Sequence, residues 1–503
     1  MSRNAIKFLL KSPHLTYLIL AVLFTGFFLF SIPPMTTPDA PNHFTRAYAI
    51  STGKLFASET GPGAESQTDT IAGKEVGIKT TNKGYWLPRN IVEYTKGPDY
   101  CNNKIASDTN HPGMCFYYQN QTEGNSPIAY FPQVLAIRIA RIFTNSPSLL
   151  AYAQEFILAS IWIVCIFFSI RATPFGKWEI VFIALLPMQI QVSFQLGADV
   201  MTIAPTTLLT AIFMRRVFSS QASQSSKKEL FFLSFLLLLS TQSKIVMIPL
   251  IFLLLCYPLD YTPLNYRKGS FTHALPVRGF AAIIPIIFLF SWSLIAKKTE
   301  RSLADVFSTA QNQIQYLSSE PLHFILSWLL NCYHWLIFQI DISTIIGNLK
   351  SMHAPLPIGF IIFGFVFLCI VLASTTNTEM EQWNSISKKR YSALFLTSLL
   401  CFVAISISAA TLLAENIIWT PINSDGIFGV QGRYFFPVLY LLAMLPPVKP
   451  ILIKDDKLRN AILAASLILF LASSRYAASC VSSYRDRRKQ IMPEAPAYTH
   501  ISS

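Results

Sequence analysis

The sequence has few charged residues. Of its 503 residues, 13% are charged and 52% are hydrophobic, whereas a soluble domain carries roughly 25% charged residues. Runs of about ten residues that alternate between apolar and polar are also missing, so a transmembrane β-barrel is not expected. Instead, apolar runs of about 20 residues, each long enough to cross a bilayer, recur along the chain. The sequence therefore predicts an all-α polytopic membrane protein.

Other absences narrow the possible functions. The sequence contains no metal-ligand spacing and no CxxC pair, so no cofactor is predicted, and the sequence neither supports nor excludes a divalent metal. No small-x-small cleavage site follows the first apolar run, residues 14–33, which is therefore interpreted as a membrane helix and not as a signal peptide. Acidic residues are scarce, 26 against 40 basic residues, and the net charge is +14. The basic residues gather in short loops, as the positive-inside rule expects, so no nucleic-acid partner is predicted.

About 10–12 transmembrane helices are expected in a single domain, residues 1–503. Basic residues at the N-terminus favour a cytoplasmic start, which places the loop 34–147 outside the cytoplasm. Residues 229–257 could form one kinked span or two half-helices that turn at Lys244. An eleventh crossing would put the basic part of the polar tail, residues 484–503, outside. The candidate spans are 14–33, 148–170, 178–194, 200–218, 229–257, 279–296, 323–340, 357–374, 391–411, 431–447 and 460–479.

The first loop is too long to be a simple connector. Outside the cytoplasm, its Cys101 and Cys115 are a plausible disulfide. In residues 128–143 the side chains of Leu135, Ile139 and Ile142 share one helical face, which predicts an amphipathic helix lying at the outer membrane surface. Residues 302–318 show a second such pattern. No repeat between the two halves of the chain, a pattern typical of transporters, is visible.

Three ionisable residues follow the first apolar run behind a proline-rich turn. Asp39, His43 and Arg46 are spaced i, i+4 and i+7, which places them on one face of a helix. A carboxylate at this position can act as a general base if its site is desolvated. The alternative is that Asp39 caps a helix or belongs to the loop.

Three further charged residues lie in or beside apolar runs, where an ionisable side chain is costly and usually functional. Lys244 lies mid-span, where it would bind an anion or serve as a counter-ion. Asp199 either takes part in substrate binding or caps the helix 200–218. Arg433 suits phosphate or carboxylate recognition, or anchors the chain at the interface with Tyr434. A carboxylate outside the membrane with cations near the headgroups would fit a polyprenyl-phosphate sugar, whose leaving phosphate the cations would stabilise.

The segment "PDAPNHFTRAYAISTGKL", residues 38–55, resembles the N-terminal signature of a bacterial membrane-protein family, domain of unknown function 2142. That family's motif reads approximately P-D-E-x-x-H-F-x-R-A. Further matches follow in the family's order over about residues 33–440: "SPIAYFPQVLAIRIAR", "LLPMQIQVSFQLGADVMT", "QSKIVMIPLIFLLL", "YLSSEPLHFILSWLLN", "IIGNLKSMHAPLP" and "GVQGRYFFPVL".

The family is similar to the GT-C glycosyltransferases, which take sugar from a polyprenyl-phosphate carrier and use an acidic residue in the first outer loop. The resemblance implies that Asp39 is this acid and that His43 and Arg46, which match motif positions, bind the substrate. It also implies that Lys244 and Arg433 bind the carrier phosphate. The chain departs from the motif at Ala40, where the family has a second acid, and this weakens any metal-bridged version of the site.

These features predict an inverting glycosyltransferase of the bacterial inner (plasma) membrane whose active site faces the periplasm. The sugar, such as glucose, would pass from a polyprenyl-phosphate donor to a surface polysaccharide such as O-antigen, or to a lipid acceptor. O-antigen glucosyltransferases have a comparable architecture, although architecture alone does not settle function. The alternatives are a transporter or flippase of polyprenyl-linked saccharide and a non-catalytic scaffold. The long first loop favours the enzyme, because an acceptor needs a platform.

Overall fold

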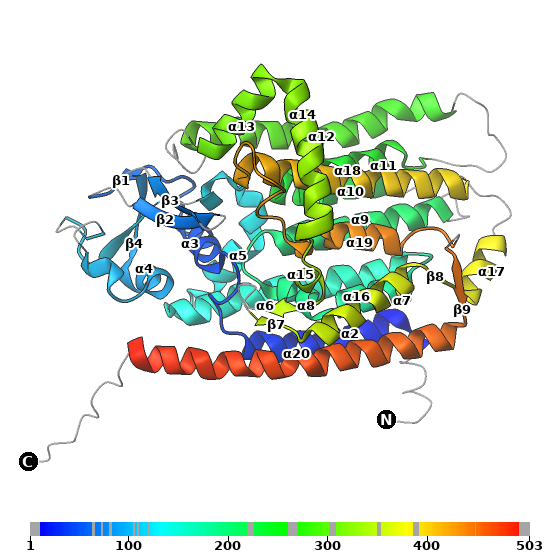
Figure 1. Cartoon of the computed structure of the whole chain (residues 1–503), viewed down its shortest axis with the longest axis horizontal. Coiled ribbons are helices and arrows are strands. Elements are labelled where there is room, and N and C mark those ends of the chain that lie inside the picture. Colours follow the sequence, from blue (N-terminus) through cyan, green and yellow to red (C-terminus); the bar gives the residue numbers. More distant parts are fainter. Residues whose placement is uncertain are drawn as a thin grey trace, which may run out of the picture.

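The structure is a computed structural model, and the chain is predominantly helical (Figure 1). It describes residues 11–491 except for 63–65, 72–73, 80–82, 104–105, 108–109, 119–120, 219–225, 260–269, 301–307, 350–353, 386–391 and 448. Most helices run side by side in one bundle, and the strands between residues 59 and 118 lie at one end of it (Figure 1). The predicted multi-pass helical architecture is confirmed.

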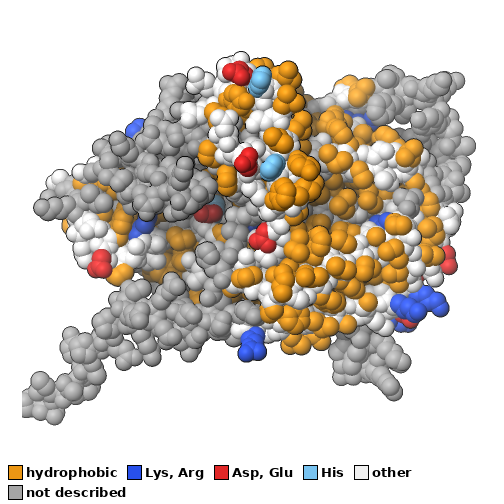
Figure 2. Space-filling view, viewed as in Figure 1, with side chains coloured by type: hydrophobic (Ala, Val, Ile, Leu, Met, Phe, Trp, Pro, Cys, Tyr) orange, Lys and Arg blue, Asp and Glu red, His pale blue; other side chains and the backbone are white. Residues whose placement is uncertain are grey.

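Six helices of the described chain are long and apolar enough to cross a membrane. Apolar side chains cover most of the described bundle surface in Figure 2, whereas Lys and Arg lie mainly at its edges. This distribution suits a bilayer, which solvates apolar side chains and leaves backbone groups to bond within the helix. The six helices are α2 (Pro13–Ser31), α6 (Pro147–Ala172), α9 (Asp199–Phe218), α12 (Ser270–Glu300), α18 (Ala393–Trp419) and α20 (Asp455–Ile491).

Helix α9 forms the centre of the bundle. Nearly all of its side chains are buried, and it packs against α6, α10 and α19. The other long helices each expose an apolar face. A site at the start of α9 is therefore surrounded by other helices of the bundle.

Two predicted spans are broken into shorter elements. The segment 178–194 forms α7 (Lys177–Ala184) and α8 (Pro187–Phe194), which are separate because Pro187 has no N–H to continue a helix. The segment 229–257 forms α10 (Ser226–Ser243), the 3₁₀ helix η4 (Ile245–Leu250) and α11 (Ile251–Leu255).

The chain reverses direction at Lys244. The Tyr257 hydroxyl, just after α11, donates to Glu229 at the start of α10 over 2.7 Å. The end of this segment has therefore returned to the level at which it began. Of the two alternatives for residues 229–257, the structure shows the pair of half-helices that turn at Lys244.

Helix α14 (Pro321–His334) does not run along the bundle. It crosses the direction of the neighbouring helices in Figure 1 and continues into η5 (Trp335–Gln339), so 323–340 is not a span parallel to the others. The second amphipathic pattern includes α13 (Ser308–Ser319), in which Ile314 and Leu317 are exposed. Its first part, residues 302–307, lies outside the described residues.

The first loop has a fold of its own. It begins with α3 (Ala40–Ser51) and contains an antiparallel sheet in which Trp86 pairs with Phe116. This sheet is absent from the predicted architecture. Its strands, in spatial order, are β1 (Glu59–Thr60), β4 (Lys83–Pro88) and β5 (Met114–Tyr118); β2 (Ser66–Ile71) pairs separately with β3 (Lys74–Lys79).

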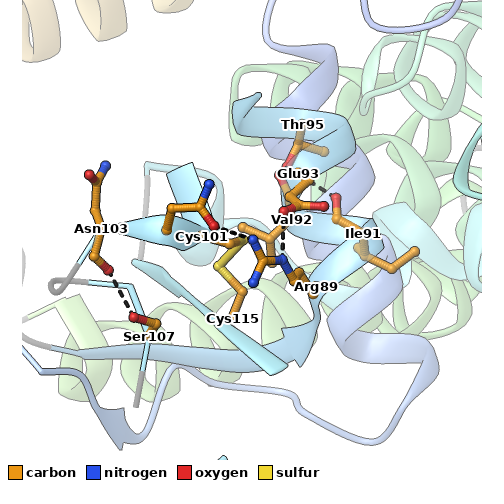
Figure 3. Close-up of a disulfide and its surroundings, with 10 residues drawn as sticks. Arg89, Ile91, Val92, Glu93, Thr95, Cys101, Asn103, Ser107 and Cys115 are labelled. Carbon is orange, nitrogen blue, oxygen red and sulfur yellow. Dashed lines mark hydrogen bonds and ion pairs between the residues drawn. A yellow bond between two sulfur atoms is a disulfide. The ribbon is translucent and has the colours of Figure 1, made fainter. Parts of the chain in front are cut away.

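A disulfide joins Cys101 to Cys115 in this loop, with the two Cα atoms 5.6 Å apart (Figure 3). It ties η1 (Tyr100–Asn102) to strand β5, beside α4 (Arg89–Lys96). Arg89 of α4 donates to Glu93 over 2.6 Å and also to the side chain of Asn102 (Figure 3). The crosslink and these contacts hold the outer part of the loop together.

The last part of the loop is the segment expected to be amphipathic, residues 128–143. It forms η3 (Pro127–Tyr130) and α5 (Phe131–Ala140), which pack against α3 and α6. Leu135, Ile139 and Ile142 are all exposed. An exposed apolar stripe beside the bundle is the arrangement that an interfacial helix requires.

Helices α2 and α20 run in the same direction. Lys11, just before α2, lines a surface pocket with Asp455, the first residue of α20. Further along both helices, Phe24 stacks on Phe470 with ring centroids 3.8 Å apart. The end of the bundle that carries residues 32–146 is called the loop face below. The C-terminal end of α20 lies at this loop face (Figure 1).

The remaining elements complete the bundle between α14 and α20. Of the predicted tail 484–503, residues up to Ile491 extend α20, and 492–503 lie outside the described part. The shorter elements after α14 are α15 (Ser343–Ile346), β6 (Asn348–Leu349), β7 (Ala354–Pro355), α16 (Ile358–Leu372), β8 (Ser374–Thr376), α17 (Asn377–Ser385), η6 (Gly432–Phe435), α19 (Phe436–Ala443) and β9 (Ile451–Ile453); η2 (Gln121–Gly124) belongs to the first loop.

Candidate functional site

A cavity of about 300 Å³ lies between α9, the turn at Lys244, α18 and the junction of η6 with α19. Asn125 from the first loop also lines it, which places the cavity toward the loop face. Most of its other lining residues are apolar and come from η4, α9 and α18. Its four charged lining residues are Asp199, Lys244, Glu415 and Arg433.

Three of the predicted site residues meet in this cavity. The Lys244 ammonium lies 2.5 Å from Asp199 Oδ1, and Arg433 Nη1 lies 3.6 Å from Asp199 Oδ2. Both cations also lie near the ring of Tyr434, Lys244 Nζ at 4.1 Å and Arg433 Cζ at 5.5 Å from its centroid. One carboxylate is thus shared by two cations, so Asp199 alone does not balance the charges of Lys244 and Arg433.

The local fold explains how each charge reaches the cavity. Lys244 has extended backbone angles between α10 and η4, so its side chain leaves the turn instead of a helix surface. Asp199 is the first residue of α9, where the helix dipole favours a negative charge. Arg433 lies in η6 and is almost completely buried. A buried arginine needs an anion nearby, and Asp199 supplies one.

Asp39 lies beside this cluster but does not line the cavity. It is exposed, directly precedes α3 and has a left-handed backbone with φ of 57°. Aspartate tolerates this conformation better than most residues, and strained backbone often accompanies functional sites. The charge of Asp39 acts on both His43 and Arg433. It is therefore near the cations while still open to solvent.

His43, one helical turn after Asp39, is linked through the Tyr130 hydroxyl to Asn125 in the wall of the cavity. The Asn125 side-chain amide donates to the Tyr130 hydroxyl over 3.1 Å, and this hydroxyl lies 2.6 Å from His43 Nδ1. A hydroxyl that accepts from Asn125 has its proton free for His43 Nδ1, which leaves the ring proton on Nε2. Burial lowers the pKa of His43 to about 4, against the opposing effect of Asp39 and Asp199. His43 is therefore a neutral imidazole at pH 7.

Gly197 lets the turn before α9 approach His43. Its φ is 151°, and a Cβ atom on this residue would lie 3.3 and 3.4 Å from the His43 ring. The Gly197 carbonyl also accepts a hydrogen bond from the buried amide of Gln133 over 2.8 Å. Helices α3 and α5 are thus fixed against the turn that carries Asp199.

Arg46 is directed away from the cavity. Its guanidinium is fully buried and forms an ion pair with Glu123 over 2.9 Å. The same nitrogen donates to the Tyr85 hydroxyl and to the carbonyl of Leu55, over 3.0 and 2.8 Å. Burial raises the pKa of Glu123, although Arg46 opposes the shift. These contacts connect α3 to the sheet, so Arg46 is a structural residue and the expectation of substrate binding is not retained.

Three residues at or next to the cavity wall are absent from the predicted site. Asn125 and Tyr130 are uncharged, and only the fold brings them to His43. Glu415 carried a usable signal, an acid within the apolar segment "TLLAENIIW", but the expected span 391–411 ended before it. Among the described residues, no group of three or more His, Cys, Asp or Glu side chains is arranged to hold a metal ion.

The fold and the cavity define a polytopic membrane protein with a buried ionic site between its helices. A family model described as "Predicted membrane protein (DUF2142)" matches residues 22–442. The chain belongs to this family, as its motifs predict. No curated protein matches the chain significantly.

Two solved structures are similar to the chain in part of their length. The apo oligosaccharyltransferase of Archaeoglobus fulgidus has a TM-score of 0.41 and 10% identity, over 92% of this chain and 56% of that protein. AglB from Archaeoglobus fulgidus, in complex with an inhibitory peptide and a dolichol-phosphate, has a TM-score of 0.34 and 11% identity, over 96% and 58%. The chain thus spans little more than half of either protein, and likeness at this level carries no argument about activity.

Proposed function

We propose that the protein is a membrane glycosyltransferase that moves a sugar from a polyprenyl-phosphate carrier to an acceptor hydroxyl at the loop face. The observation that carries this proposal is the placement of Lys244 and Arg433 in one largely apolar cavity. Two cations that share a single carboxylate suit a phosphate, to which both can donate charge-assisted hydrogen bonds. A volume of about 300 Å³ is at the lower end for small-molecule sites and would hold a headgroup but not a long lipid chain.

A second feature supports a donor attached to a lipid. An apolar groove of about 470 Å³ lies between α14, α18 and α19. It is lined by Ala404, Ser408 and Leu412 of α18, and the cavity is lined by Thr411 and Glu415 of the same helix. Residues three apart share a helix face, so Ser408 of the groove and Thr411 of the cavity are neighbours on α18. A lipid chain in the groove would keep its phosphate at the cavity.

The charged groups Lys244, Arg433 and Asp39 can each be given a role in a direct transfer of the sugar. The acceptor oxygen attacks the anomeric carbon, the bond from this carbon to the phosphate oxygen breaks, and the electron pair leaves with the phosphate. Lys244 and Arg433 stabilise the charge that develops there. Asp39, exposed at the loop face, takes the proton of the acceptor hydroxyl. Attack from the side opposite the phosphate inverts the anomeric centre.

We further propose that the loop face is the periplasmic face of a bacterial inner membrane. The disulfide between Cys101 and Cys115 supports this orientation, because disulfides persist in oxidising compartments. The folded first loop and the exposed apolar stripe of α5 would form a platform for the acceptor. A surface polysaccharide such as O-antigen, or a lipid, fits such a platform.

Asp39→Asn tests the proposed reaction. We expect transfer of labelled hexose from polyprenyl phosphate to acceptors in right-side-out membrane vesicles to fall roughly a hundredfold or more, as for loss of a general base. Asp456→Asn removes the same charge from an exposed position at the start of α20 and should leave transfer unchanged. Wild-type transfer by Asp39→Asn would rule out its catalytic role. Translocation of the intact donor without transfer would favour the flippase alternative.

A further inference from the structure

Glu415 is a charged residue of the cavity that the transfer step does not use. It lies on α18 and lines the cavity together with Lys244 and Arg433. The ion pairs of those two cations in the described structure go to Asp199. Within the described part of the chain, no cation lies within 4.0 Å of Glu415, and its Oε2 is buried with no hydrogen-bond partner. A buried carboxylate oxygen without a donor is costly, so a donor supplied by a ligand would be stabilising.

The loop that follows α18 lies beside Glu415. Gly429 has φ of 81°, and a Cβ atom there would lie 2.8 Å from Glu415 Oε2 and 2.9 Å from the Trp419 ring. Glycine is therefore needed for the loop to approach the carboxylate. The next residue of the helix, Asn416, accepts a hydrogen bond from Asn331 of α14 over 3.2 Å. The loop thus passes close to the Glu415 carboxylate, and the adjacent residue of α18 is bonded to α14.

The neighbours of Glu415 indicate which part of a donor it would meet. A phosphate belongs near Lys244 and Arg433 and would be repelled by a second carboxylate. The uncharged polar lining residues are hydroxyls and an amide, including Thr202, Thr411 and Asn125. An ionised carboxylate only accepts hydrogen bonds, and its two oxygens can take both protons from a pair of neighbouring hydroxyls. Sugars carry such pairs, and a polyprenyl phosphate without sugar carries none.

We propose that Glu415 binds hydroxyl groups of the donor sugar and thereby distinguishes the loaded carrier from the bare one. This inference rests on the proposed function, because it assumes that the cations hold the carrier phosphate. With the sugar present, its hydroxyls satisfy Glu415. After transfer, the carboxylate faces only the phosphate and disfavours the bound product. The same residue would then favour donor binding and product release.

The experiment compares two ligands. Dissociation constants are measured for polyprenyl-phosphate hexoses (glucose, galactose and mannose) and for polyprenyl phosphate, with purified protein in nanodiscs. We expect Glu415→Gln to weaken binding of the best hexose donor about tenfold or more, as for loss of a hydrogen bond to a charged group. Binding of the bare carrier should stay equal or become tighter, because a negative charge has been removed. Lys244→Met should weaken both ligands.

Controls separate this inference from the proposed function. Glu381→Gln, an exposed acid of α17, should change neither affinity. Glu415→Asp keeps the charge but shortens the side chain, and it should also lose preference for the loaded carrier if Glu415→Gln does not fold. Equal effects of Glu415→Gln on both ligands, or no effect, would overturn the role of Glu415 alone. Failure of the wild-type protein to bind either ligand would overturn the proposed function as well.

Discussion

At the scale of single residues, the buried pair of Arg46 and Glu123 determines how the first loop attaches to the bundle. Both side chains are almost fully buried, and the Tyr85 hydroxyl bonds to both. Replacing one partner leaves the other charge buried and unpaired. We expect Arg46→Met to lower the free energy of unfolding by about 3–5 kcal/mol. Arg215→Met, in a half-exposed pair with Glu229, should cost about 1 kcal/mol or less and serves as the control.

Chemical unfolding in detergent measures these differences in the free energy of unfolding. The pH dependence of that free energy is a second test. Burial raises the pKa of Glu123, and the loss of Arg46 would raise it further. The folded Arg46→Met protein would then bind a proton that the unfolded chain releases, so its stability should rise as the pH falls from 8 to 5. The double variant Arg46→Met/Glu123→Met should recover most of the loss. An unchanged unfolding free energy for Arg46→Met would contradict the structural role.

The contrast between Arg46 and the cavity residues shows what the sequence could predict. The spacing from Asp39 placed Arg46 on the same helix face, but its partner Glu123 lies 77 residues away and no local pattern connects the two. Lys244 was found because a charge in an apolar run is costly. Its partner Asp199 and the distant Arg433 were found separately, by the same reasoning. Only the fold could show that they share one cavity.

At the scale of elements, the reversal at Lys244 creates the cavity. A continuous helix through residues 229–257 would carry Lys244 on its surface, whereas the turn into η4 lets α18 pack against it. The sequence left both possibilities open because Lys244 and Pro249 are compatible with either a kink or a turn. Packing against α12 and α18 decides between them, and such contacts cannot be read from local sequence.

The α18 groove gives a prediction about the lipid chain. Ser408→Trp places an indole between α14 and α18, in the path that a chain would take from the cavity. We expect hexose transfer from a long polyprenyl phosphate to fall at least tenfold, while a donor with one or two prenyl units keeps most of its rate. Transfer assays in nanodiscs with the two donors measure the ratio.

A control variant and two possible results decide whether the groove binds the lipid chain. Ser160→Trp introduces the same side chain on α6, away from the groove, and should affect both donors little. An equal loss for long and short donors would indicate a packing defect. Unchanged transfer from the long donor would exclude the groove as the binding site of the lipid chain.

At the scale of the whole molecule, the parallel arrangement of α2 and α20 determines the side of the membrane at which α20 ends. The basic segment "YRDRRKQ", residues 484–490, favours a cytoplasmic C-terminus by the positive-inside rule. The stacking of Phe24 on Phe470 and the proximity of Lys11 to Asp455 instead place the two helix starts at one face. Charge bias is a preference summed over short loops, and interhelical packing can outweigh it.

Labelling with a membrane-impermeant thiol reagent tests this topology. Single cysteines replace Asp99, Asp456 or Gln490 in a protein whose unpaired cysteines are serine. We expect the Asp99 and Gln490 positions to be labelled in intact right-side-out vesicles, since Asp99 belongs to the first loop and Gln490 to the last turn of α20, at the loop face. The Asp456 position, at the start of α20, should react only after permeabilisation. Labelling of the Asp456 position in intact vesicles, with the Gln490 position reacting only after permeabilisation, would mean that α20 runs opposite to α2. A cytoplasmic Asp99 position would remove the oxidising environment that the disulfide requires.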